Sequence, residues 1–189
     1  MDKNLLLGGA ALQRCIYAGK KSAALAAEVT RAMRISTRGN TGHSTYFVTA
    51  ATYQRKSLFQ TDRMAQLFLD VLFHYRSQDK YLLHEYVIMP DHFHLLISPL
   101  ITLERAMQLI KGGFSYRVRK ELGCAGEIWE TSFHDRRVRD LAEYERFREY
   151  IWRNPVERRL ATVPGDYLYS SAHEKAVLDR LPRRLKPVA

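Results

Sequence analysis

The sequence has very little cysteine and no long hydrophobic run. Its 189 residues include only two cysteines, Cys15 and Cys124, which lie far apart and outside any Cys-x-x-Cys pattern. This excludes a disulfide framework and a zinc ribbon and is typical of a reducing compartment. The apolar residues 5–12 are too few to span a bilayer, and no convincing signal-peptide cleavage site follows them. We therefore expect a cytoplasmic protein without a membrane partner.

The sequence is also short of acidic residues. Thirty lysines and arginines outnumber 20 aspartates and glutamates, which gives a net charge of +10 that is spread along the chain. This balance favours a polyanionic partner, and nucleic acid is favoured over a membrane because no long basic amphipathic helix stands out. The length and a hydrophobic fraction of 46% suit one domain with a proper core.

Hydrophobic periodicity predicts an alternation of strands and helices. We expect strands at residues 43–53, 81–89, 92–98 and 128–138, and helices at residues 61–78, 102–122 and 140–154. Hairpins mixed with helices favour an α+β fold, in which helices pack on an antiparallel sheet in a ferredoxin-like arrangement.

The ordered domain is predicted to cover residues 43–173. Residues 1–42 are expected to form a flexible N-terminal arm with a weak helix at residues 22–33, because this part is rich in small residues and ends in a linker-like segment. Residues 174–189 are basic and contain two prolines, and they are expected to form a loosely held tail.

A stretch of ten residues, 89–98 (MPDHFHLLIS), lies at the centre of the predicted sheet. Its Pro-Asp turn folds the preceding strand back into it. Because side chains alternate along a strand, His92 and His94 share one face and Phe93 lies on the other. Two imidazoles at this spacing can bind one metal ion, and we predict that these two do. Taken alone, a His-x-His pattern is more often a pair of exposed polar positions.

The helix at residues 102–122 carries a tyrosine that its periodicity leaves outside the core. The apolar stripe consists of Leu103, Met107, Ile110, Phe114 and Val118. Tyr116 lies roughly 200° from the middle of that stripe, and Gly112 and Gly113 leave room for a backbone or a ligand beside it. We predict that Tyr116 lies over the histidine pair as a nucleophile; a surface tyrosine that stacks on a base is the alternative. Tyr144 and Tyr150 are predicted to be core or rim residues.

A metal ion beside a tyrosine predicts phosphoryl transfer. A phenol with a pKa near 10 is a poor nucleophile at neutral pH, but a metal and a nearby lysine favour its phenolate. The metal would also polarise a phosphate oxygen and orient the scissile bond for in-line attack. The product would be a tyrosine linked to the 5′-phosphate of a nucleic acid, with a 3′-hydroxyl as the leaving group, so that strands can be rejoined without ATP.

Several motifs in one order resemble a known family. They are residues 89–94 (MPDHFH), 111–116 (KGGFSY), 128–130 (IWE), 132–137 (SFHDRR), 150–156 (YIWRNPV) and 169–171 (YSS). Together they resemble the REP-associated tyrosine transposases, domesticated relatives of insertion-sequence transposases that carry an HUH motif (His, hydrophobic, His). The resemblance covers residues 43–173.

The resemblance implies an HUH nuclease fold and a metal-dependent, site-specific endonuclease and strand transferase. Such an enzyme would act on single-stranded DNA at hairpin-forming REP repeats, through a covalent 5′-phosphotyrosine intermediate. By position, the resemblance implies that His92 and His94 bind Mg²⁺ or Mn²⁺ and that Tyr116 is the nucleophile. It further implies a bacterial, nucleoid-associated protein that acts as a monomer.

One position departs from the family pattern. Relatives place Asn or Gln one helical turn after the tyrosine, where the amide completes the metal site, whereas this chain has Lys120, which cannot bind a metal while it is protonated. Glu121, His134 or water would then be the third ligand. A weakly active or inactive protein that binds DNA or RNA hairpins is therefore the alternative, and replication initiation or plasmid mobilisation is another use of HUH motifs.

Seven basic residues are the predicted DNA contacts. They lie near Tyr116 and at the end of the last predicted strand: Lys111, Arg117, Arg119, Lys120, Arg136, Arg137 and Arg139. Such side chains mostly contact phosphates, so they would position the DNA without reading its sequence. A solvated surface is the alternative for each of them.

Overall fold

The structure, a computed structural model, describes residues 44–173, 178–182 and 185. Its centre is an antiparallel sheet with the strand order β2-β3-β1-β4. The strands are β1 (Tyr46–Ala51), β2 (Tyr81–Met89), β3 (His92–Pro99) and β4 (His134–Arg137). This order confirms the predicted α+β, ferredoxin-like fold.

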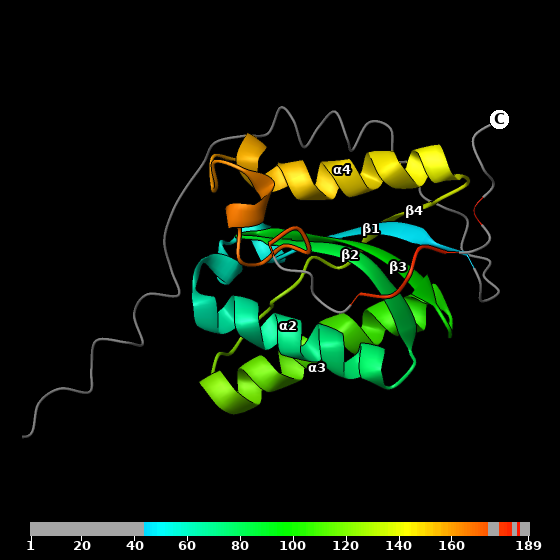
Figure 1. Cartoon of the computed structure of the whole chain (residues 1–189). Helices are drawn as coiled ribbons and strands as arrows, with labels where there is room; N and C mark the ends of the chain where they lie inside the picture. The colour runs from blue at the N-terminus through cyan, green and yellow to red at the C-terminus, as the bar shows by residue number, and fades with distance from the viewer. Residues whose placement is uncertain (1–43, 174–177, 183–184, 186–189) are drawn as a thin grey trace, which may run out of the picture.

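Three helices cover the two faces of the sheet. Helices α2 (Asp62–Ser77) and α3 (Leu103–Leu122) lie on one face, and α4 (Leu141–Glu157) lies on the other (Figure 1). Short 3-10 turns follow β1 at Tyr53–Arg55 and Leu58–Gln60, and another lies at Pro164–Asp166. Within the described residues, no helix combines the length and the apolar character needed to cross a membrane.

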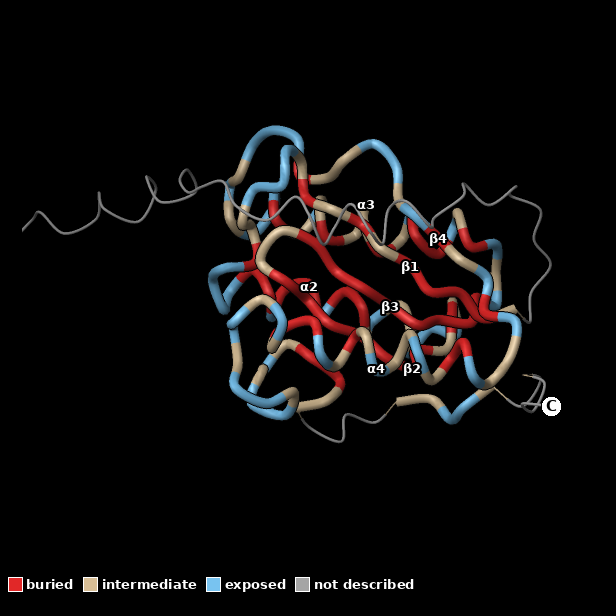
Figure 2. The backbone as a smooth tube through the Cα atoms, turned by 90° about the horizontal axis from the view of Figure 1, so that it is seen from above, coloured by how far each residue is buried: buried red, intermediate tan, exposed pale blue. Residues whose placement is uncertain are grey.

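Strand β3 lies inside the sheet and is buried along its whole length, as the tube in Figure 2 shows. Its odd-numbered positions, such as Phe93 and Leu95, belong to the core shared with α2 and α3. Leu96 belongs to the second core, beneath α4. Because side chains alternate, His92 and His94 point in the same direction as Leu96, towards α4. A strand held by neighbours on both edges is a rigid platform for a site.

Side-chain caps and a glycine mark most of the helix ends. The hydroxyl of Thr102 accepts the backbone N–H of Arg105 (3.3 Å) at the start of α3, and Gly123 ends this helix with a φ of 62°. At the start of α4, the carboxylate of Asp140 accepts the N–H of Glu143 (2.8 Å). Thr61 precedes α2 without a side-chain capping bond.

The last strand is shorter than predicted, and the last helix is longer. Of the strand predicted at residues 128–138, only His134–Arg137 form β4. Residues 128–130 pair only briefly with the end of β1, where the N–H of Tyr53 donates to the Ile128 carbonyl (2.9 Å) and the N–H of Glu130 to the Ala51 carbonyl (3.0 Å). The carbonyls of Glu130 and Ser132 then accept hydrogen bonds from Lys111 of α3, and no strand pairing is present between this bridge and β4. Helix α4 continues through Pro155 to Glu157. A proline removes one N–H donor, and within the last turn of a helix this loss interrupts few further bonds.

The described part of the C-terminal tail is not the loosely held arm that the sequence predicts. The Asp179 carboxylate accepts two N–H groups of Arg76 (2.7 and 3.0 Å) and the backbone N–H of Leu83 in β2 (2.7 Å). A charged pair that also satisfies a strand N–H anchors this segment to the sheet edge. The predicted arm at residues 1–42, with its helix at 22–33, lies outside the described residues.

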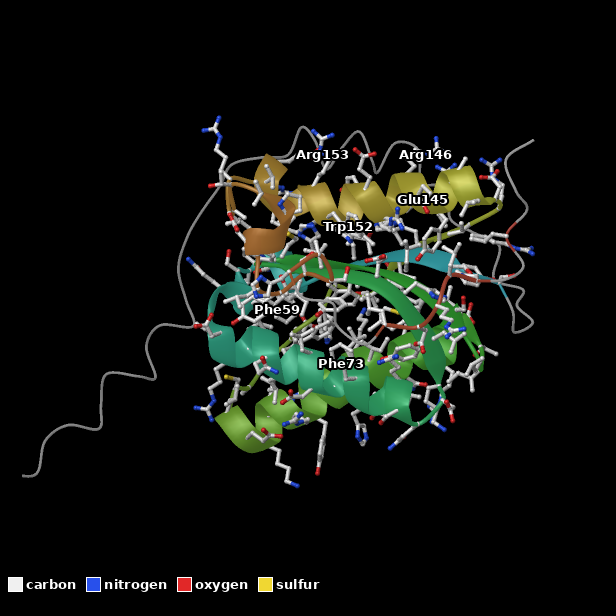
Figure 3. The ribbon with its side chains drawn as sticks, in the orientation of Figure 1. Phe59, Phe73, Glu145, Arg146, Trp152 and Arg153 are labelled. Atoms are coloured by element: carbon white, nitrogen blue, oxygen red, sulfur yellow. The ribbon has the colours of Figure 1, made fainter. Side chains whose placement is uncertain are left out.

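A buried carboxylate links α4 to β2. Glu85 is 7% exposed, and its Oε2 accepts the indole N–H of Trp152 (2.9 Å) and the hydroxyl of Ser171 (2.6 Å). Figure 3 shows Trp152 on the side of α4 that faces the sheet, with Arg153 on the outer side. Burial raises the pKa of Glu85, although the two hydrogen bonds act in the opposite direction.

Glu85→Gln is expected to stabilise the protein at neutral pH. Because the folded pKa is raised, the Glu85 contribution is most favourable below the ordinary value of 4.5 and declines as pH rises through the folded pKa. A glutamine oxygen can accept both hydrogen bonds without burying a charge. Thermal melts should show a Tm at pH 7 that is higher by about a few degrees and less dependent on pH.

Glu85→Ala is the control. It loses the hydrogen-bond acceptor and should be less stable than wild type by about 2 kcal/mol. A lower Tm for Glu85→Gln than for wild type would contradict this account.

Two adjacent glycines in α3 have different roles. A Cβ added at Gly113 would lie 2.7 Å from Cε2 of Tyr75 and 3.2 Å from Cγ1 of Val71, both in α2, whereas a Cβ at Gly112 meets nothing within 4 Å. Gly113 therefore permits the close approach of α2 and α3. Gly112→Ala should raise the free energy of unfolding by about 1 kcal/mol through helix propensity. At Gly113 the clash should cancel this gain or reverse it, and urea unfolding of the two variants measures the difference.

Candidate functional site

The two histidines of β3 meet beneath α4. The Nε2 atoms of His92 and His94 lie 3.1 Å apart, and the residues are 3% and 2% exposed. The Nδ1 atom of His92 lies 2.6 Å from a carboxylate oxygen of Asp91, and that of His94 lies 2.7 Å from the hydroxyl of Thr49 in β1. Since a carboxylate can only accept, Nδ1 of His92 carries the proton and a neutral ring directs the Nε2 lone pair inwards.

Burial keeps this pair neutral. Loss of hydration lowers the pKa of His92, partly offset by the hydrogen bond that His92 donates to Asp91, and lowers the pKa of His94 well below its usual value. Although burial acts to raise it, the pKa of Asp91 is lowered by its hydrogen bond to His92. Neutral imidazoles whose outer nitrogens are held by a carboxylate and a hydroxyl have the form that binds metal ions.

Helix α4 places two further polar groups against the pair. Tyr150 and Asn154 are four residues apart and therefore share one face of the helix. The ring of Tyr150 lies 5.1 Å from that of His94, and Nδ2 of Asn154 lies 3.4 Å from Nε2 of His94. Burial raises the pKa of Tyr150, and hydrogen bonding from the Asn154 amide acts to lower it.

The amide of Asn154 has an unsatisfied oxygen. The residue is 4% exposed, and within the described part of the chain its Oδ1 atom has no hydrogen-bond partner. A buried carbonyl oxygen without a partner costs roughly 1–3 kcal/mol, so such an atom in a native protein calls for a ligand. Two inward imidazole nitrogens and this oxygen are a donor set that suits a divalent cation.

In the described part of the chain, the further candidate donor next to the imidazole pair is the amide of Asn154. Among the described residues, no cluster of three or more His, Cys, Asp or Glu side chains could hold a metal ion. Glu121, predicted as an alternative third ligand, accepts a hydrogen bond from the guanidinium of Arg117 on the surface of α3 (2.6 Å). His134, the other alternative, is exposed and pairs with Thr49 across the sheet, so β1 separates it from His94.

The structure does not bring Tyr116 to the histidines, which corrects the predicted geometry. Tyr116 lies on α3, on the face of the sheet opposite α4 (Figure 1). It is 61% exposed, as its helical position predicts, and it lines an open hollow on the outer side of α3. Four strands and a hydrophobic core therefore lie between this hydroxyl and the imidazole pair.

The predicted DNA-binding cations lie away from the pair, and several are engaged with other groups. On α3, Lys111 is half-buried and donates to the carbonyls of Glu130 (2.8 Å) and Ser132 (3.3 Å). Arg117 pairs with Glu121. The other two predicted DNA contacts on α3, Arg119 and Lys120, are exposed.

The second group lies at the edge of the sheet near the start of α4. Arg136 and Arg139 both pair with Glu143, which is fully buried and anchors this helix end. Arg137 is exposed at the end of β4. Arg55 was not among the predicted residues, yet its guanidinium lies 3.6 Å from the Asp91 carboxylate beside the histidines. Burial and the charge of His92 are the larger causes of the lowered pKa of His94, and the charges of Arg55 and Arg158 lower it further.

A signal for the α4 residues was present in the sequence. The family pattern places an amide side chain one helical turn after the tyrosine. Lys120 stands in that position after Tyr116, whereas Asn154 stands in it after Tyr150. Tyr150 was predicted to be a core or rim residue because Ile151 and Trp152 follow it, and these two residues do face the interior. A partly buried tyrosine can lie in a core and border a site at the same time.

Comparison with known proteins identifies relatives of this chain. A family model described as Transposase IS200 like matches residues 41–154. A protein of Haemophilus influenzae that carries the name "Putative REP-associated tyrosine transposase" is 24% identical over 140 residues, which is 64% of this chain and 80% of the relative. A solved structure of a REP-associated tyrosine transposase bound to a REP hairpin superposes with a TM-score of 0.64 at 20% identity, over 79% of this chain and 90% of that one. The family resemblance seen in the motifs is confirmed, and the superposition confirms the fold.

Proposed function

The chain belongs to the IS200-like transposase family, and on this premise we propose that it cleaves and rejoins single-stranded DNA at hairpin-forming repeats with Tyr150 as the nucleophile. The observation that carries this proposal is the position of Tyr150 and Asn154 against the buried pair of His92 and His94. Tyr116 would have to cross the sheet to reach the same pair.

The proposed reaction is a transesterification at phosphorus. The Tyr150 oxygen attacks the scissile phosphate, the bond from phosphorus to the 3′-oxygen breaks, and the phenolic proton is ultimately carried by the released 3′-hydroxyl. The 5′-phosphate stays on the tyrosine, so attack by another 3′-hydroxyl reverses the step and joins strands. The amide N–H of Asn154 and the charges of Arg158 and Arg55 act to lower the pKa of Tyr150, against its burial.

The donor set fits a divalent metal ion. The nitrogens Nε2 of His92 and His94 and the oxygen Oδ1 of Asn154 would hold it. When bound, such an ion would withdraw charge from a phosphate oxygen. Two imidazoles favour Mn²⁺ over Mg²⁺ among the two ions that the family resemblance implies. Asp91 and Thr49 would keep the imidazoles in their orientation.

A DNA hairpin is the proposed substrate. The solved structure with the same fold is bound to a REP hairpin, and the net charge of +10 suits a polyanion. Arg55 and Arg158 lie near the proposed site and carry charge that could face the scissile phosphate.

A monomer is the proposed state, and the covered edge of β2 supports it. The backbone N–H of Ile88 donates to Tyr169 (2.8 Å), that of Ser171 to Tyr86 (2.9 Å) and that of Asp179 to Leu83 (2.9 Å). An edge strand that is already paired with its own chain offers few groups to a second sheet.

Formation of a covalent adduct tests the proposed function. A labelled single-stranded hairpin with its flanking bases is incubated with the protein and Mn²⁺, and a denaturing gel should show a protein–DNA band that EDTA prevents. Peptide mapping of the adduct should locate the label on Tyr150. Tight hairpin binding without an adduct in either Mg²⁺ or Mn²⁺ would instead favour a binding protein that has lost its activity.

A further inference from the structure

An open hollow lies on the outer side of α3, on the face of the sheet opposite the histidine pair. Its volume is about 630 Å³, within the range of sites that hold small ligands. Apart from Lys111, its lining consists of Gly112, Ser115, Tyr116, Arg119, Lys120 and Trp129. The hollow has no part in the chemistry proposed above.

The hollow presents an aromatic ring to solvent. Tyr116 is 61% exposed, which makes it one of the most exposed large hydrophobic residues in the described part of the chain. One turn earlier, Gly112 has open space where a side chain would stand, so the ring is not screened from that direction. An exposed aromatic surface of this kind can stack on a planar group such as an unpaired base.

The charge around this ring is positive. The ammonium of Lys120 lies 5.5 Å from the centre of the Tyr116 ring, and Arg119 uses one nitrogen to donate to the Gly126 carbonyl (3.2 Å). The nearby carboxylate of Glu121 is held by Arg117 and does not line the hollow. Lys111 supports the wall through its bonds to two carbonyls instead of facing a ligand. An aromatic ring with cations beside it matches a base and its phosphates.

We propose that this hollow binds a single-stranded segment of the DNA substrate, with a base stacked on Tyr116 and neighbouring phosphates against Lys120 and Arg119. The inference rests on the proposed function for its choice of DNA. A single strand is preferred to a duplex stem because only an unstacked base can cover the ring. Since the hollow and the histidine pair lie on opposite faces, the bound segment belongs to a flank that passes around the molecule.

Two hairpin substrates separate this contact from cleavage. One carries only the bases needed for cleavage, and the other carries an added single-stranded flank of about 15 nucleotides, a length chosen to exceed the site sizes of single-strand-binding folds. Fluorescence anisotropy should show that wild-type protein binds the flanked hairpin more tightly. Tyr116→Ala should weaken flanked-hairpin binding by roughly 5- to 150-fold, which is the usual effect of removing one stacked aromatic residue.

Matched variants test the physical basis of the contact. Tyr116→Phe keeps the ring and should bind the flanked hairpin within about twofold of wild type. Lys120→Gln should weaken this binding and reduce the slope of log K against log salt by about one. In addition, 5-bromouracil placed in the flank should crosslink to the peptide that contains Tyr116.

The outcomes distinguish this inference from the proposed function. If Tyr116→Ala, with a wild-type melting curve, binds both hairpins as wild type does, the hollow is not a DNA contact. If Tyr116→Phe loses as much affinity as Tyr116→Ala, stacking is not the cause. If the flank effect and crosslink are present but wild-type protein forms no adduct, the hollow binds DNA and only the proposed cleavage fails.

Discussion

Tyr150→Phe is expected to form no covalent DNA adduct, with a loss of at least about 10³-fold in the rate of cleavage. The variant removes only the attacking oxygen. Its ring should keep the contacts with His94 (5.1 Å) and Phe47 (5.8 Å), so the fold and the metal site should be preserved. The measurement is the initial rate of adduct formation on a denaturing gel at saturating Mn²⁺.

The direct rival in this test is Tyr116→Phe, since the sequence pattern favoured Tyr116. If the geometry beneath α4 determines the reaction, Tyr116→Phe forms the adduct and Tyr150→Phe does not. Hairpin affinity of Tyr150→Phe should stay within about threefold of wild type, because a lost hydroxyl contributes little to phosphate binding. An adduct that persists in Tyr150→Phe and disappears in Tyr116→Phe would reverse the assignment.

Most of the fold could be predicted because its signals are local. Residues 81–89 are rich in strand-forming side chains and end at a Pro-Asp turn, and they form β2 as predicted. The stripe from Leu103 to Val118 is buried, and Gly123 ends the helix with a left-handed backbone. The length of β4 was overestimated because the apolar Ile128 and Trp129 look like strand residues, whereas they pair with the end of β1 only in an isolated bridge and pack into the core beneath the sheet. Tertiary packing decides such cases.

The candidate site was only half predictable from sequence. Alternation places His92 and His94 on one face of a strand, but it does not say which helix covers that face. Both crossover helices, α2 and α3, lie on the same side of the sheet, which leaves the other side to α4 (Figure 1). This follows from the right-handed crossover rule once the strand order is known, and the order depends on long-range pairing. Periodicity therefore showed that Tyr116 is outside the core without showing on which side of the sheet it lies.

Asn154→Ala is expected to weaken Mn²⁺ binding by roughly 10- to 100-fold or more, the range found when a metal ligand loses its support. Asn154 lies beside the imidazole pair, and its buried Oδ1 atom has no hydrogen-bond partner among the described residues, so it costs stability unless a cation is present. Removing it relieves that cost and leaves a small cavity, and these two effects oppose each other. In EDTA, the free energy of unfolding should therefore change by less than about 1 kcal/mol.

This combination separates a ligand from a structural residue. Wild-type protein should gain thermal stability on addition of Mn²⁺, and Asn154→Ala should lose most of this gain while its melting curve in EDTA is nearly that of wild type. Asn154→Asp keeps an oxygen at this position and should recover most of the affinity, whereas His94→Ala should not bind the ion. Equal Mn²⁺ affinity of Asn154→Ala and wild type would mean that another donor completes the site. Because an amide oxygen is a neutral ligand, its replacement by a carboxylate should also shift the balance between Mn²⁺ and Mg²⁺ towards the harder ion.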